Sequence, residues 1–102
     1  MEQSLGICVA SRNHMQHVLG LANAAQMAGK QVEIFFTGDG VHLTQDRRFG
    51  ELMKLARVAV CEVSFIAHGY KGKEPPGLGD KDFATQARNA EMVAECDRYV
   101  IL

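Results

Sequence analysis

The sequence predicts a single α/β domain in which helices cover both faces of a mainly parallel β-sheet of four to five strands. Short apolar runs of strand length alternate along the chain with longer segments of helical periodicity. Continuous apolar runs are typical of strands that are buried on both faces of a parallel sheet. The 102 residues suffice for one domain. We therefore expect one three-layer α/β/α domain over residues 1–102, whose strand order the sequence does not reveal.

Four apolar runs are predicted as strands. The clearest, residues 31–37, is dense in β-branched and aromatic residues, and the run at residues 58–60 is too short and too β-branched for a helix. The other two lie near the ends of the sequence, at residues 4–10 and 98–102.

Helices are predicted between the strands. In the first, at residues 14–28, apolar residues recur at helical spacing and Gly29 is placed to end it. For a short helix at residues 64–69, Ser64 is the expected N-cap and Gly69 the expected C-terminal glycine. The remaining helical segments are residues 49–56 and 82–95, with a short helical turn at residues 41–44, and residues 70–80 are expected to be irregular.

Composition restricts the possible functions. The net charge of −1 argues against non-specific binding to nucleic acid, which requires a basic surface. No run is long enough to cross a membrane, and residues 1–4 lack the basic start and apolar core of a signal peptide. The three cysteines are widely spaced and odd in number, which predicts reduced thiols rather than a disulfide framework. We therefore expect a cytoplasmic protein without a membrane or nucleic-acid partner.

Cys61 is the leading candidate for chemistry. It follows the strand at residues 58–60, and in open parallel sheets reactive groups gather at the carboxyl ends of strands. The helix that follows would favour a thiolate there, whereas Glu62 would raise the thiol pKa if its side chain lay close. Cys8, inside a strand, is predicted to be a buried hydrophobic residue, and Cys96, at a helix end, ranks below Cys61.

Two further groups are expected at the same edge of the sheet. Gly38-Asp39-Gly40 follows the second strand, but the missing third glycine favours a tight turn over a phosphate-binding loop. His14, His17 and His42 also follow strand ends and could bind zinc, although their loose spacing matches no metal motif. The sequence therefore assigns no metal ligand and no cofactor.

The order of these motifs resembles that of the DsrE/DsrF-like family of small sulfur-relay proteins, which includes TusD. The resemblance covers nearly the whole chain as one DsrE-like domain. It is carried by the opening strand with its alanine-rich helix, by IFFTGDGV at residues 34–41, by Val60-Cys61 followed by Ala67-His68-Gly69, and by AECDRYV at residues 94–100.

The resemblance implies a trimeric or hexameric α/β protein in which Cys61 accepts sulfane sulfur as a persulfide from a donor protein and passes it to an acceptor protein. Gly38, Asp39 and Gly40 would line the same edge. His68 stands where family members often carry a basic residue and would help to balance charge. The alternative is a non-catalytic oligomeric module of the same fold that binds a small ligand or a protein. The residues alone leave open whether the protein is an enzyme.

Overall fold

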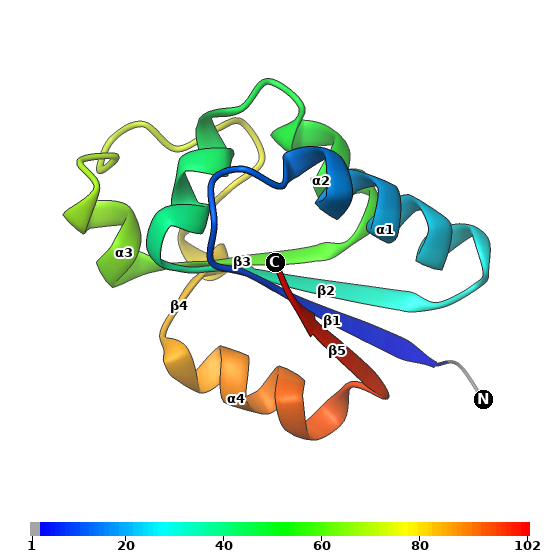
Figure 1. Cartoon of the computed structure of the whole chain (residues 1–102). Coiled ribbons are helices and arrows are strands. Elements are labelled where there is room, and N and C mark those ends of the chain that lie inside the picture. Colours follow the sequence, from blue (N-terminus) through cyan, green and yellow to red (C-terminus); the bar gives the residue numbers. More distant parts are fainter. Residues whose placement is uncertain (1–2) are drawn as a thin grey trace.

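The computed structural model, described here for residues 3–102, has a five-stranded parallel sheet with helices interleaved along the chain (Figure 1). Met1 and Glu2, which belong to the N-terminal stretch considered for a signal peptide, lie outside the described residues. The predicted α/β fold class is confirmed. The strands are β1 (Ser4–Val9), β2 (Gln31–Phe36), β3 (Arg57–Cys61), β4 (Phe83–Ala84) and β5 (Arg98–Ile101).

The strands are arranged in the order β4-β3-β2-β1-β5, with every neighbouring pair parallel. Each connection therefore returns to the same end of the sheet, and the residues that follow β2 and β3 meet at one edge. The connecting helices are α1 (Met15–Met27), α2 (Phe49–Leu55), α3 (Glu62–Ala67) and α4 (Gln86–Glu95), together with the 3-10 helices η1 (Gly38–Gln45) and η2 (Asp80–Asp82).

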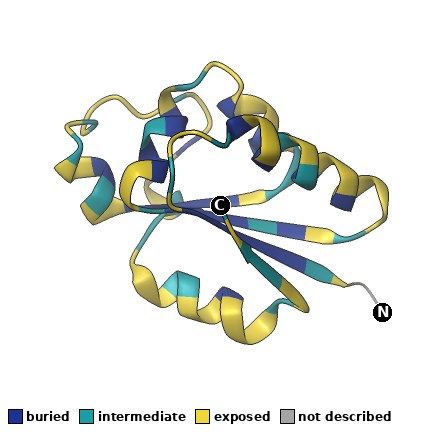
Figure 2. Cartoon of the chain, in the orientation of Figure 1, coloured by how far each residue is buried: buried dark blue, intermediate teal, exposed yellow. Residues whose placement is uncertain are grey.

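The two faces of the sheet are covered unequally. Helices α1, α2 and α3 and the segment η1 lie on one side, and α4 lies alone on the other (Figure 1). Alternation along β3 shows the division, since Val58 and Val60 join the larger core whereas Ala59 and Cys61 join the smaller core beneath α4. Most of α4 faces outward and is exposed, and Met92 is its buried anchor (Figure 2).

Most predicted elements are present within a residue or two of their expected bounds. The glycines expected after the first and third helices are confirmed, because Gly29 and Gly69 have φ angles of 78° and 82°, which favour glycine. The stretch at residues 70–80 is largely irregular, as predicted, and Leu78 is its buried anchor.

Two predictions about helix starts are wrong. The third helix begins at Glu62, so Cys61 and not Ser64 occupies its N-cap position. The last helix begins at Gln86, because Phe83 and Ala84 form β4 beside β3, and the hydroxyl of Thr85 then accepts the backbone N–H of Ala87 as the cap.

Candidate functional site

Cys61 lies at the carboxyl end of β3, as predicted, and the next residue begins α3. Its side chain belongs to the smaller core on the α4 side of the sheet and is only 4% exposed. The start of α4 follows the neighbouring strand β4, which pairs Cys61 with Ala84. The thiol therefore lies where the ends of β2 and β3 meet the first residue of α4.

Ser64 supplies the first donors to the sulfur of Cys61. Its hydroxyl oxygen accepts the backbone N–H of Gly38 at 3.0 Å, which leaves the hydroxyl proton free to be donated to sulfur. The backbone N–H of Ser64 also points to the thiol as a hydrogen-bond donor. The connection from Gly38 through Ser64 to Cys61 thus links the end of β2 to the end of β3, and such chains strengthen the individual bonds.

Gln86 and Thr37 complete the donor set from the α4 side. The side-chain amide of Gln86 donates to the hydroxyl of Thr37 at 2.8 Å and to the sulfur of Cys61 at 3.8 Å. Because the Thr37 oxygen accepts from Gln86, its own proton is available for the sulfur. The Gln86 side chain therefore contacts both the sulfur and Thr37, and it joins the start of α4 to the end of β2.

These contacts favour ionisation of Cys61. Burial raises the pKa of the thiol, but the hydrogen bonds from Ser64, Thr37 and Gln86 outweigh burial, so the pKa lies below the ordinary thiol value. The Glu62 side chain is exposed, and it is not among the groups that set this pKa. The negative charge of Glu62, which the sequence suggested as an obstacle to ionisation, therefore does not raise the pKa of Cys61. The uncharged donors Ser64, Thr37 and Gln86 stabilise the thiolate.

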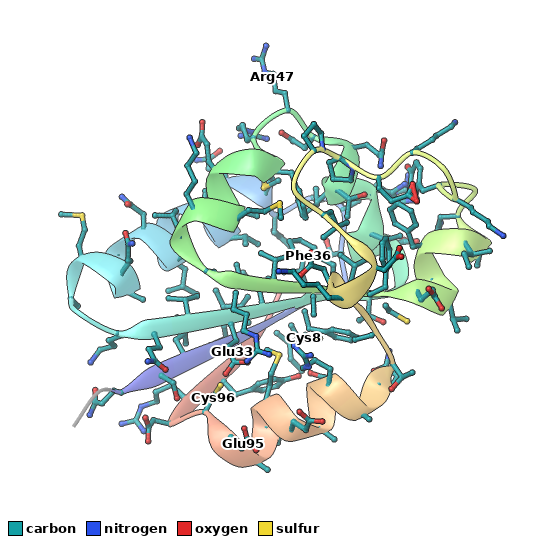
Figure 3. The ribbon with its side chains drawn as sticks, turned by 180° about the vertical axis from the view of Figure 1, so that it is seen from behind. Cys8, Glu33, Phe36, Arg47, Glu95 and Cys96 are labelled. Carbon is teal, nitrogen blue, oxygen red and sulfur yellow. The ribbon has the colours of Figure 1, made fainter. Side chains whose placement is uncertain are left out.

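The other two cysteines behave in the opposite way. Burial raises the pKa of Cys8, and burial together with the negative charge of Glu33 raises the pKa of Cys96, whose thiol faces that carboxylate at 3.8 Å. Figure 3 shows Cys8, Glu33 and Cys96 close together between the sheet and α4. All three cysteines are free thiols. The predicted ranking of Cys61 above Cys96 thus has a physical basis in their surroundings.

The Gly38-Asp39-Gly40 segment forms the tight start of η1 at the same edge of the sheet. Gly38 has a φ angle of 53°, and a Cβ atom on Gly40 would lie 1.9 Å from the carbonyl oxygen of Val9. The two glycines therefore serve the backbone path, one through its conformation and the other through its close approach to β1. Gly38 contacts the Cys61 site through Ser64, whereas Asp39 pairs with Arg12 and His68.

The histidines group differently from the expectation. His14, at the N-cap position of α1, faces His17 on the first turn of that helix, with ring centroids 5.4 Å apart. His42 instead packs edge-on against His68, with ring centroids 4.6 Å apart, and Nε2 of His68 lies 3.6 Å from Oδ1 of Asp39. The contacts of His68 described here lead to Asp39 and His42, whereas Cys61 is surrounded by uncharged donors.

Neither a comparison with protein-family models nor a search of curated proteins finds a match to this chain. The DsrE/DsrF-like resemblance therefore stays a prediction that rests on the order and spacing of the motifs. Among residues 3–102, no helix is both long enough and apolar enough to cross a membrane.

Sequence reasoning did not identify the residues that surround Cys61. The sequence predicts Ser64 as the cap of the short helix, Thr37 as the end of a strand and Gln86 as part of the last helix. Gln86 reaches the sulfur only because β4 places the start of α4 beside β3. A two-residue strand carries no periodicity, so the sequence offered no signal for this contact.

Proposed function

We propose that the protein is a sulfur-relay protein in which Cys61 carries sulfane sulfur as a persulfide. The observation that carries the proposal is the set of hydrogen-bond donors from Ser64, Thr37 and Gln86 around one thiol, which lowers its pKa despite burial. Thiolate is the form of cysteine that attacks a sulfur–sulfur bond. The other two cysteines have raised pKa values, so Cys61 is the thiol best suited to this reaction.

The transfer consists of two balanced displacements. The Cys61 thiolate attacks the outer sulfur of a donor persulfide, a new sulfur–sulfur bond forms, and the donor leaves as a thiolate. The acceptor thiolate then attacks the outer sulfur of the Cys61 persulfide, and Cys61 leaves as a thiolate again. The donors from Ser64 and Thr37 stabilise Cys61 as the leaving thiolate in the second step. The cytoplasm, which keeps thiols reduced, is the compartment that we propose for this relay.

Access to Cys61 is controlled by Gln86. The thiol is almost fully covered, whereas Gln86 is exposed and reaches from Thr37 across to the sulfur. Rotation of the Gln86 side chain would uncover the sulfur without moving the sheet. We propose that a donor protein displaces this amide when it docks, so that the thiol is shielded from bulky disulfides between transfers while small reagents still reach it.

The test of the proposal is persulfide loading followed by intact-mass measurement. After incubation with glutathione persulfide, the wild-type protein should gain one sulfur atom, and Cys61→Ser should gain none. Cys96→Ser is the matched control and should load like the wild type. Equal loading of Cys61→Ser and wild type would refute the assignment of Cys61, and loaded sulfur that no added thiol acceptor removes would refute a relay.

The alternative function is a non-catalytic oligomeric module that binds a small ligand or a protein. The burial of Cys61 favours this alternative, since a thiol that stays covered packs as a small hydrophobic residue. It predicts that Cys61 resists small alkylating reagents at neutral pH, whereas the relay predicts rapid alkylation. A rate profile of iodoacetamide labelling against pH separates the two functions.

We also propose that the protein is a homo-oligomer, a trimer or a hexamer. Val63 and Ile66 expose apolar side chains on the short helix α3, and the exposed Gly20 and Ala24 leave a small-residue face on α1. Such surfaces are suited to close contact between subunits. Light scattering coupled to size-exclusion chromatography should give a mass of three or six chains, and a monomer at micromolar concentration would contradict the proposal.

A further inference from the structure

A second cluster of polar side chains lies on the other side of the sheet from Cys61. Asp39 and His42 belong to η1, and His68 follows the end of α3. Tyr70, which contacts His42, packs against the larger core, whereas Cys61 belongs to the smaller core under α4. The cluster therefore does not share its side chains with the proposed relay site.

Among residues 3–102, these three side chains form the one group of metal-ligating residues close enough to bind a single ion. One ligand atom from each of Asp39, His42 and His68 lies within 4.8 Å of the other two. Ligand atoms of a tetrahedral zinc site lie about 3.3 Å apart, because zinc–nitrogen and zinc–oxygen bonds measure about 2.0–2.2 Å. The 3.6 Å between Nε2 of His68 and Oδ1 of Asp39 already approaches that separation.

We propose that Asp39, His42 and His68 bind a divalent transition-metal ion, with zinc as the best match. Two imidazole nitrogens and one carboxylate oxygen are typical ligands of zinc sites that keep a fourth position open. Small rotations of the side chains would bring the ligand atoms to the shorter separation of a zinc site. Asp39 and His68 can make such rotations, since their side chains are 52% and 29% exposed.

Tyr70 provides the contact that orients His42. Its hydroxyl oxygen lies 2.5 Å from Nδ1 of His42, and the two rings meet edge-on. With Nδ1 protonated and donating to Tyr70, the lone pair of His42 is on Nε2, which is then the nitrogen that binds the metal. A metal-binding histidine generally has such an outer partner for its second nitrogen. Tyr70 is thus a positioning residue in the proposed site.

The positive charge of Arg12, beside Asp39, opposes the binding of a cation by the cluster. The Arg12 guanidinium lies 3.7 Å from Oδ2 of Asp39, whereas His68 faces Oδ1. One carboxylate oxygen therefore pairs with Arg12, and the other is left on the side of His68 for the metal. The Arg12 side chain is 58% exposed and can move into solvent when the metal binds. The ion pair therefore weakens the metal site without blocking it.

Zinc titration of the protein, freed of metal with a chelator, tests the proposal. Wild type should bind one equivalent of zinc, and Co²⁺ should give the absorption bands of a tetrahedral ion. Tyr70→Phe removes an outer partner of a ligand and should weaken zinc binding roughly 10- to 100-fold. Asp39→Asn and His68→Gln remove ligands and should each weaken zinc binding by at least as much. The same titration of Cys61→Ser should give the wild-type affinity for zinc, so that failure of the relay thiol and failure of metal binding are measured separately.

The double variant His14→Gln/His17→Gln is the matched control, because it removes an adjacent pair of histidines outside the cluster. It should bind zinc like the wild type. Thermal melting of each variant without metal shows whether the fold is kept, and Asp39→Asn provides a nearly isosteric change at an exposed position. Failure of the wild type to bind zinc or cobalt, or equal loss of affinity in the control variant, would overturn the proposal.

Discussion

Replacing Ser64 with alanine should change the reactivity of Cys61 in opposite directions at neutral and at alkaline pH. The substitution removes a hydroxyl that accepts the Gly38 N–H and donates to the Cys61 sulfur. Burial then opposes ionisation with fewer donors to offset it, so the pKa of the thiol rises. The variant therefore has less thiolate at neutral pH, but its thiolate is more basic.

The size of the effect follows from the energy of one hydrogen bond. A bond to a charged group contributes about 1.5–3 kcal/mol, and for a weak acceptor such as sulfur we take the lower end, which is about tenfold in thiolate population. Nucleophilicity rises with basicity with a coefficient of about 0.4–0.5, which returns about threefold. Alkylation of Cys61 in Ser64→Ala should thus be about threefold slower near pH 7 and about threefold faster where both thiols are fully ionised.

The assay is iodoacetamide labelling across pH, with the Cys61 peptide quantified by mass spectrometry so that Cys8 and Cys96 do not contribute. Ser64→Thr keeps a hydroxyl and should restore the wild-type profile. Ser11→Ala is the control, because it removes a hydroxyl that accepts the backbone N–H of Asn13. It should leave the labelling rate of Cys61 unchanged. Rate profiles of Ser64→Ala and wild type that coincide at every pH, or that never cross, would refute the reasoning.

Other substitutions test the backbone, the covering amide and the metal site. Gly40→Ala places a Cβ 1.9 Å from a β1 carbonyl oxygen and should lower the free energy of unfolding by more than the ~1–3 kcal/mol of ordinary overpacking. Gly20→Ala places a Cβ with no neighbouring atom within 4 Å and should raise the free energy of unfolding by about 0.5–1 kcal/mol. Urea denaturation measures both changes, and equal effects of the two substitutions would contradict this reasoning. Gln86→Ala should increase labelling of Cys61 by a bulky aromatic disulfide relative to iodoacetamide, and an unchanged ratio would show that this amide does not control access. Arg12→Gln should tighten zinc binding roughly two- to fivefold at low salt, and weaker binding would contradict the proposed repulsion.

The sheet was predictable because its strands are apolar on both faces. Phe35 and Phe36 are both fully buried although they point to opposite sides, and a run with two apolar faces indicates a strand between two helix layers. The place of Cys61 at a strand end followed from the same pattern. Strand order was not predictable, because the pairing of β5 with β1 joins segments far apart in the sequence.

The surroundings of the two sites were harder to predict, since they depend on contacts between different connections. The sequence groups His42 with His14 and His17, because all three follow strand ends, but η1 packs against α3 and brings His42 to His68. The pairing of Ser64 with Gly38 has the same origin. Local patterns predict which residues reach an edge of the sheet, whereas the packing of the loops decides which of them meet.

The two proposed sites share an edge of the sheet but lie on opposite faces, and Gly38 and Ser64 connect them. Gly38 donates its N–H to Ser64, which in turn donates to Cys61, and the next residue, Asp39, belongs to the proposed metal site. A metal ion that fixes Asp39 would also fix the backbone at Gly38, and a fixed donor stabilises a thiolate better than a mobile one. The Ser64 hydroxyl is therefore one link between the sites, and its removal should weaken their coupling, whereas Thr37, the residue before Gly38, keeps a second link to the sulfur.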